Sequence, residues 1–203
     1  MTPAEHGEDR DWMARVRDGD LEALGALYDK YRLPVFHTAL AITRDHAVAE
    51  DILQECFLRL NAHAARIDAT LPLLPWLYRV TVNLSYSYVS RDARRKVSLE
   101  GLIDHFEQFV APAGHAPEAQ AERRDLESCV RDAVQALPFH QRAVVVLYYV
   151  GGLDLKEIAY ILDCPVGTVK SRLHSSREAL RKQLVGSLEP QTARTLGVVY
   201  DYV

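Results

Sequence analysis

The sequence predicts an all-α protein made of two small helical bundles joined by a flexible linker, the second containing a helix-turn-helix. Apolar residues recur at helical spacing along most of the 203 residues, and the valine-bearing runs follow the same period. The periodicity weakens in one acidic segment near the middle of the chain. Residues 154–184 then combine a short apolar helix, a proline-containing break and a longer basic helix, which is typical of a helix-turn-helix.

The first domain is expected over residues 11–96. Residues 1–10 are polar, and we expect them to be frayed. A helical pattern over 11–31 is interrupted at 18–20, where Asp20 can cap the helix that follows.

The remaining helices of this domain have recognisable starts. Pro34 can occupy the first turn of a helix that runs to about Thr43. Asp45 precedes a helix over 47–63, and a loop with two prolines leads into a helix over 76–91.

An acidic linker is expected over 97–121, where glycine and proline punctuate the sequence. The second domain is expected over 122–185, with Pro138 starting a helix that a pair of glycines ends. Residues 186–203 form a C-terminal tail without an assigned role.

The helix-turn-helix is predicted from two apolar stripes separated by a break. The first stripe consists of Leu155, Ile158, Ala159 and Leu162. Asp163, Cys164 and Pro165 interrupt it, because proline lacks an N–H donor and disfavours helical geometry at its predecessor. The second stripe consists of Val169, Leu173 and Leu180.

The second helix of this motif carries side chains suited to a DNA major groove, where cations reach phosphates or guanine edges and hydroxyls read several bases. The candidate DNA-binding residues are Thr168, Lys170, Ser171, Arg172, His174 and Arg177. A solvated basic face on an ordinary bundle helix is the alternative interpretation.

A second basic segment ends the first domain, where cations and aromatic residues alternate. Cations attract phosphates and aromatic rings can stack on unpaired bases. The candidates are Trp76, Arg79, Asn83, Arg91, Arg94, Arg95 and Lys96. Alternatively, the aromatic residues are core anchors and the cations a solvated helix end.

The helix over 47–63 has a polar face suited to a protein partner. Asp51, Gln54, Glu55 and Leu58 fall at i, i+3, i+4 and i+7. Ordinary solvent exposure of an amphipathic helix would give the same pattern.

Several function classes lack support. The three cysteines are far apart, and no metal-ligand spacing, phosphate-binding glycine loop or nucleophile motif occurs. We therefore expect no metal, no cofactor, no small-molecule substrate and no enzymatic activity. With neither a membrane-length apolar run nor a signal peptide, a cytoplasmic location is expected.

The order of these segments resembles bacterial RNA polymerase sigma factors of the sigma-70 family, extracytoplasmic function (ECF) type. Residues 137–184 resemble the domain that binds the promoter −35 element. Residues 49–60 are similar to the core-polymerase-binding helix, and residues 75–96 resemble the segment that engages the −10 element.

The resemblance implies a division of labour. Asp51, Gln54, Glu55 and Leu58 would dock on the clamp helices of the largest polymerase subunit, and the second domain would also contact the flap of the second-largest subunit. The loop 67–75 and the following helix would hold a flipped base and help melt the −10 region. An anti-sigma partner and a stress or envelope-response regulon are expected by the same resemblance.

The chain departs from the family pattern at two positions: Ser87 stands where an aspartate is common, and Asp163 replaces the usual turn glycine. The tail is longer than in the minimal pattern. The rival interpretations are a free-standing dimeric helix-turn-helix regulator and an adaptor that sequesters another regulator. Neither requires both the polar face of the first domain and the basic helix of the second.

Overall fold

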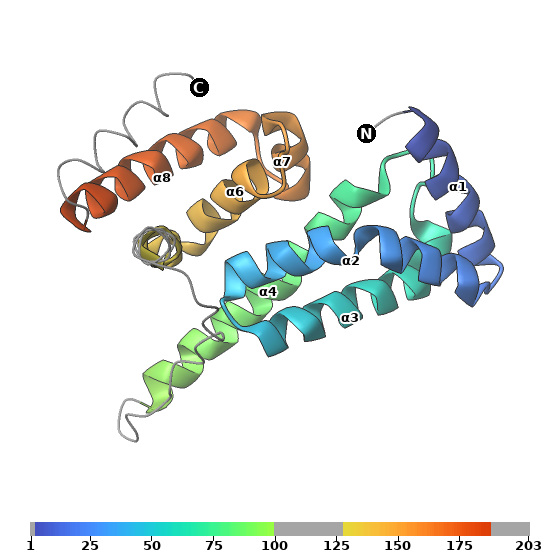
Figure 1. The fold of residues 1–203 in the computed structure, drawn as a ribbon, viewed down its shortest axis with the longest axis horizontal. Coiled ribbons are helices and arrows are strands. Elements are labelled where there is room, and N and C mark those ends of the chain that lie inside the picture. Colours follow the sequence, from blue (N-terminus) through green and yellow to red (C-terminus); the bar gives the residue numbers. More distant parts are fainter. Residues whose placement is uncertain (1–2, 100–127, 188–203) are drawn as a thin grey trace, which may run out of the picture.

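The computed structural model describes residues 3–99 and 128–187, with side chains for 7–91 and 128–184. Within these ranges every regular element is a helix and no strand occurs, which confirms the all-α prediction. Figure 1 shows two groups of helices lying against each other. One helix spans residues 128–136. The other elements are α1 (Pro3–Arg17), α2 (Leu21–Thr43), α3 (His46–His63), the 3-10 helix η1 (Ala64–Arg66), α4 (Leu73–Leu99), α6 (Phe139–Tyr149), α7 (Leu155–Ile161) and α8 (Val166–Ser187).

Two of the expected domain boundaries, at residues 96 and 185, fall near the ends of α4 and α8, whereas the one at residue 11 lies inside α1. Helix α4 continues to Leu99, past the boundary expected at residue 96. Most of the predicted linker and of the C-terminal tail lies outside the described residues, as does the predicted start of the second domain. The linker and the tail therefore stay predictions.

The first bundle packs α1, α2, α3 and α4 around one apolar core. Leu27, Val35, Cys56, Leu60 and Leu77 are completely buried in it. Burial raises the pKa of the Cys56 thiol to about 12, since the thiolate would have to form without water. This cysteine is a core residue.

Residues 3–10 lie in a helix, so the expectation of a frayed segment was wrong for them; residues 1 and 2 lie outside the described residues. Helix α1 begins at Pro3, and Asp9 is buried against α2. Lys30 Nζ donates to Asp9 Oδ1 at 2.7 Å, and the Tyr31 hydroxyl donates to the other carboxylate oxygen. A polar segment is thus held by a paired charge, which apolar periodicity does not reveal.

Helix α2 is continuous, and the expectation that Pro34 begins a separate helix was also wrong. Pro34 lies inside α2. The residues of α2 on both sides of Pro34 bury one apolar stripe, whose packing outweighs the lost backbone hydrogen bond. The predicted cap at Asp20 is confirmed, since Asp20 accepts from Glu22 N at 2.9 Å; Asp45, expected only to precede the next helix, also caps it and accepts from Val48 N at 3.1 Å.

The second bundle packs α6 between α7, α8 and the helix at 128–136. Pro138 immediately precedes α6, as predicted. The glycine pair that follows α6 is required by geometry. Gly152 has a φ of +64°, and a Cβ on Gly151 would lie 2.6 Å from the Leu147 carbonyl oxygen.

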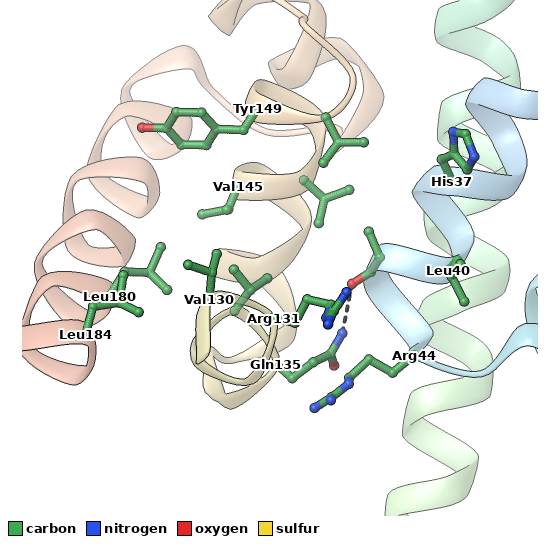
Figure 2. A pocket seen from close by; sticks show the side chains of 14 residues that line it. His37, Leu40, Arg44, Val130, Arg131, Gln135, Val145, Tyr149, Leu180 and Leu184 are labelled. Atoms are coloured by element: carbon green, nitrogen blue, oxygen red, sulfur yellow. Dashed lines mark hydrogen bonds between the residues drawn. The ribbon is translucent and has the colours of Figure 1, made fainter. Parts of the chain in front are cut away.

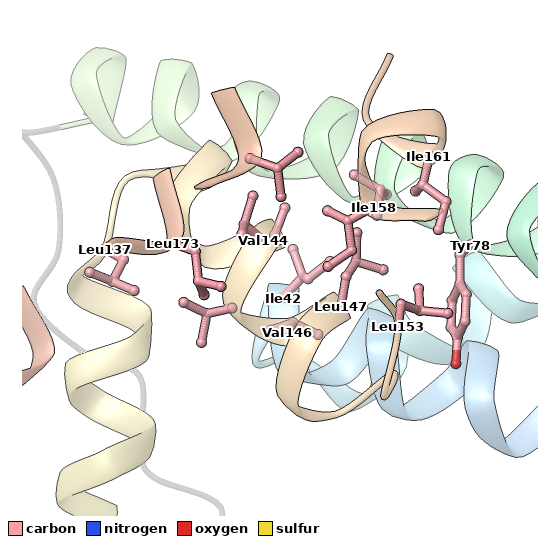
Figure 3. Packing of buried hydrophobic residues seen from close by; sticks show 14 of the residues in the cluster. Ile42, Tyr78, Leu137, Val144, Val146, Leu147, Leu153, Ile158, Ile161 and Leu173 are labelled. Atoms are coloured by element: carbon pink, nitrogen blue, oxygen red, sulfur yellow. The ribbon is translucent and has the colours of Figure 1, made fainter. Parts of the chain in front are cut away.

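The two bundles share an apolar cluster. Ile42, Tyr78 and Val82 of the first bundle are buried together with α6, α7 and α8. In Figure 3, Ile42 lies beside Leu147 and Tyr78 lies beside Leu153. The bundles therefore make a common core in this structure, which the prediction of two linked domains did not include.

Arg142 of α6 stabilises the contact between the bundles by hydrogen bonds at the end of α2. Its guanidinium donates to Ile42 O at 2.8 Å, Gln135 Oε1 at 2.6 Å, Gln135 O at 2.7 Å and Leu137 O at 3.1 Å. Gln135 Nε2 in turn donates to Ala41 O at 2.8 Å. Burial, with a smaller contribution from the charge of Arg44, lowers the pKa of Arg142.

Replacing Arg142 with methionine should lower the free energy of unfolding by about 1–3 kcal/mol, because it leaves the half-buried carbonyls without donors. Urea unfolding followed by circular dichroism measures this loss. Arg44→Met is the matched control, since it removes only an exposed ion pair with Asp132 (2.6 Å), worth about 0–1 kcal/mol. Equal losses in the two variants would contradict the role of Arg142.

Candidate nucleic-acid and protein interfaces

Helix α7 starts at a capping box. Asp154 accepts from Lys156 N at 2.7 Å and Glu157 N at 2.9 Å, and Glu157 Oε2 accepts from Asp154 N at 2.8 Å. The hydrogen bonds from the Glu157 and Lys156 backbones hold the pKa of the Asp154 carboxyl below its usual range. The carboxylate thus fixes the first residue of this short helix.

The turn between α7 and α8 depends on Asp163, whose φ of +49° lies in the left-handed region. An aspartate therefore adopts the backbone conformation that favours glycine, the residue usual at this turn in the family pattern. Cys164 N donates to Ala159 O at 3.1 Å, which closes the turn on the small residue of α7. The departure at Asp163 changes the residue and keeps the geometry.

Helix α8 has one buried side and one open side. Val169, Leu173 and Leu180 are buried, as the apolar stripe predicted. Ser176 is buried on the same side, where its hydroxyl donates to Arg172 O at 2.6 Å. This satisfies the polar group that burial removes from water.

The open side of α8 gathers half of the six residues predicted to read DNA. Lys170, Ser171 and His174 are exposed, while Thr168 is half-buried near the start of the helix. The two arginines flank this surface. Arg172 is half-buried with Nη1 3.8 Å from Cys164 Sγ.

Arg177 turns toward α6. Its Nε donates to the Tyr149 hydroxyl at 3.0 Å, and its guanidinium lies 5.5 Å from the centre of the Tyr148 ring. These contacts hold the charge at the edge of the open surface.

The basic segment of α4 is divided between core and surface. Trp76 is half-buried against the core of the first bundle, so part of its side chain serves packing. Asn83 is exposed, and Arg91 donates to Ser87 O at 3.0 Å. Arg94, Arg95 and Lys96 lie in α4, but their side chains are outside the described residues.

The helix-turn-helix contacts Arg79, whose side chain remains 37% accessible. Arg79 Nη2 lies 3.4 Å from Asp163 Oδ2, and the guanidinium carbon is 5.8 Å from the centre of the Tyr160 ring. Further along α4, Tyr86 packs on Phe139 with a ring-centre distance of 5.0 Å. One residue of the candidate −10 surface, Arg79, is therefore in contact with the other bundle, a juxtaposition that sequence reasoning missed.

The polar face of α3 is open. Asp51, Gln54 and Leu58 are exposed, and the Leu58 side chain is 65% accessible. Glu55 is half-buried and accepts from Arg59 Nε at 2.7 Å. In Figure 1, α3 lies on the side of the first bundle away from α6, α7 and α8, so this face is available to a partner while the bundles are in contact.

The described residues contain no group of three or more histidine, cysteine or acidic side chains placed to hold a metal ion. None of the helices described is both long enough and apolar enough to cross a bilayer.

Two family models match the chain: "Sigma-70 region 2" over residues 27–95 and "Sigma-70, region 4" over residues 127–180. The ECF RNA polymerase sigma factor SigW of Bacillus subtilis is 35% identical over 179 residues, which cover 84% of this chain and 93% of that protein. The ECF RNA polymerase sigma-E factor of Escherichia coli is 31% identical over 172 residues, with coverages of 82% and 88%.

Two solved structures share the fold. CnrH, in complex with the cytosolic domain of CnrY, aligns with a TM-score of 0.66 at 22% identity and covers 89% of this chain and 99% of its own. The sigma factor RpoE of Bartonella quintana, in complex with the anti-sigma factor NepR, aligns with a TM-score of 0.61 at 22% identity, with coverages of 78% and 96%.

Because Asp163 is left-handed, we expect a glycine at this position to give a more stable protein than an alanine. Both variants lose the exposed ion pair with Arg79, so their difference isolates the backbone. Asp163→Gly should be more stable than Asp163→Ala by about 1–2 kcal/mol in urea unfolding. At Lys182, in the interior of α8, the order should reverse by about 1 kcal/mol. The same order at both positions would contradict a left-handed Asp163.

Proposed function

The chain belongs to the ECF sigma factors of the sigma-70 family, and we propose that it directs core RNA polymerase to promoters whose −35 and −10 elements it reads with separate bundles. The observation that carries this proposal is the open basic side of α8 together with a polar, exposed face on α3 of the other bundle. A free-standing repressor would need only the first of these surfaces.

The −35 element is assigned to α8. Lys170, Ser171 and His174 face solvent together and are positioned to enter a major groove. Thr168 lies at the start of the helix, where hydroxyl and backbone donors commonly meet phosphates. Arg172 and Arg177 would reach bases or phosphates at the edges once their contacts with Cys164 and Tyr149 are exchanged for DNA.

The −10 element is assigned to α4. Asn83 and Arg91 are exposed along it, and Trp76 keeps an accessible part for stacking. Arg79 would contribute once it is released from Asp163. Arg94, Arg95 and Lys96 continue the helix toward its C-terminus as proposed phosphate contacts.

Reading both elements requires the bundles to separate. Two elements about 25 base pairs apart lie roughly 85 Å apart along B-DNA at about 3.4 Å per base pair. The bundles in this structure share one apolar cluster, and Arg79 is paired with Asp163. We propose that polymerase holds the bundles apart, with the clamp helices on Asp51, Gln54, Glu55 and Leu58 and the flap on the second bundle.

The same closed arrangement suits control by an anti-sigma factor, and we propose such a partner and a stress or envelope-response regulon. RpoE of Bartonella quintana, which shares the fold, is in complex with the anti-sigma factor NepR. Promoter selection needs no catalytic group in this chain, because the polymerase performs the chemistry.

Charge reversal on α3 tests polymerase docking. Asp51→Lys/Glu55→Lys should lower promoter-dependent transcription in vitro by at least about tenfold, because like charges would oppose a basic partner surface. Glu22→Lys/Asp29→Lys changes the charge equally on exposed positions of α2 and should leave transcription near the wild-type level. Normal transcription from the α3 variant would contradict the docking assignment. Palindrome binding without polymerase would favour a free-standing regulator.

Two substitutions on α8 separate phosphate from base contacts. Lys170→Ala should weaken binding to all promoters alike and reduce the salt-dependence slope by about one. Arg172→Ala should weaken binding by about 1–3 kcal/mol and relax the preference at one base pair. Binding of the polymerase holoenzyme to −35 variants at several salt concentrations measures both. Lys182→Ala, an exposed lysine farther along α8, is the control and should have neither effect.

A further inference from the structure

An apolar groove of about 700 Å³ runs between the two bundles. Figure 2 shows its walls, which come from α2, α6, α8 and the helix at 128–136. The lining residues include Leu40 from α2 and Val130 from the helix at 128–136. They also include Val145 and Val150 from α6 and its end, and Leu184 from the end of α8. The groove thus touches both bundles at once.

The groove exposes apolar side chains that nothing in the described residues covers. Val130 is 37% accessible, Tyr149 48% and Val150 55%. Contiguous exposed apolar surface is unfavourable in water and usually marks a binding site. The volume is that of a site for a few large side chains.

The chain's own C-terminal tail begins beside this groove. Leu184 forms part of the wall, and α8 ends at Ser187. The tail, 188–203, reads LEPQTARTLGVVYDYV, and six of its last eight residues are apolar. Pro190 disfavours continuation of α8 along its axis.

The tail is long enough to return along the groove. Residues 188–196 can span up to about 30 Å when extended. Helix α6, which lines the groove, has 11 residues and is about 16 Å long. The apolar end at 196–203 can therefore reach any part of the wall.

Charge also favours this occupant. Arg131 and Arg44 stand among the lining residues, Arg44 being paired with Asp132 at 2.6 Å, whereas the groove has no acidic lining residue. Asp201 is the one charged side chain in 196–203. An acidic residue within an apolar segment matches an apolar groove with basic residues at its edge.

We propose that residues 196–203 dock in this groove and bridge the two bundles. The tail then covers Val130, Tyr149 and Val150 and adds to the contacts that hold the bundles together. This docking goes beyond the proposed function and would oppose the separation of the bundles that promoter reading requires.

Site-specific photo-crosslinking in the full chain tests the proposal. A benzophenone amino acid replaces Tyr202, and mass spectrometry maps the products after irradiation. We expect crosslinks within one chain to peptides that contain Val130 or Val150. An equal mixture of isotopically light and heavy chains separates crosslinks within a chain from those between chains. Products between chains, products elsewhere in the fold or no products would overturn the proposal.

Substitutions on both sides of the contact make the result specific. Val130→Glu/Val150→Glu should lower the crosslink yield by about tenfold, and both positions are exposed enough to keep the fold. Val199→Asp/Val203→Asp changes only the tail and should have the same effect. Leu21→Glu, at a residue 72% accessible and outside the groove, should leave the yield unchanged. Unchanged yields in both double variants would exclude docking in the groove.

Discussion

The contact between the bundles depends on the carbonyl groups at the end of α2. The last carbonyls of any helix lack partners within that helix. Here Ala41 O and Ile42 O accept from Gln135 and Arg142, which belong to the other bundle. The cation also lies at the negative end of the helix dipole. The hydrogen bonds that satisfy the last carbonyls of α2 are therefore the same ones that join the bundles. Separating the bundles leaves these carbonyls without their donors.

This coupling gives the closed arrangement an appreciable free energy. Separation exposes Ile42, Tyr78 and Val82, which are buried in the shared cluster. Each large apolar side chain costs about 1.5–3 kcal/mol when it returns to water. Contacts with polymerase and promoter must exceed the sum of these costs for the proposed open state to form. A surface open in both states, such as the polar face of α3, is the natural place for the first encounter.

The sequence predicted features encoded by neighbouring residues and missed those that depend on distant ones. The predicted cap at Asp20 is confirmed, and the helix expected after Asp45 begins there, because a cap needs only the residues beside it. Pro34 lies mid-helix because packing across the bundle outweighs a local preference. The open side of α8 was predictable from its apolar stripe. The ion pair of Arg79 with Asp163 and the hydrogen-bond network of Arg142 were not predictable, because each joins residues far apart in the chain.

Asp163 combines a local conformational preference with a contact to a distant residue. A left-handed aspartate is locally unfavourable compared with glycine, which would take the same φ without a Cβ penalty. Only a residue with a side chain, however, can pair with Arg79, and it does so across the bundle contact. The pair is exposed and contributes about 1 kcal/mol at most, which is no more than the backbone cost. Aspartate at this turn therefore adds little net stability, and its specific effect is to favour the arrangement in which Arg79 contacts the helix-turn-helix.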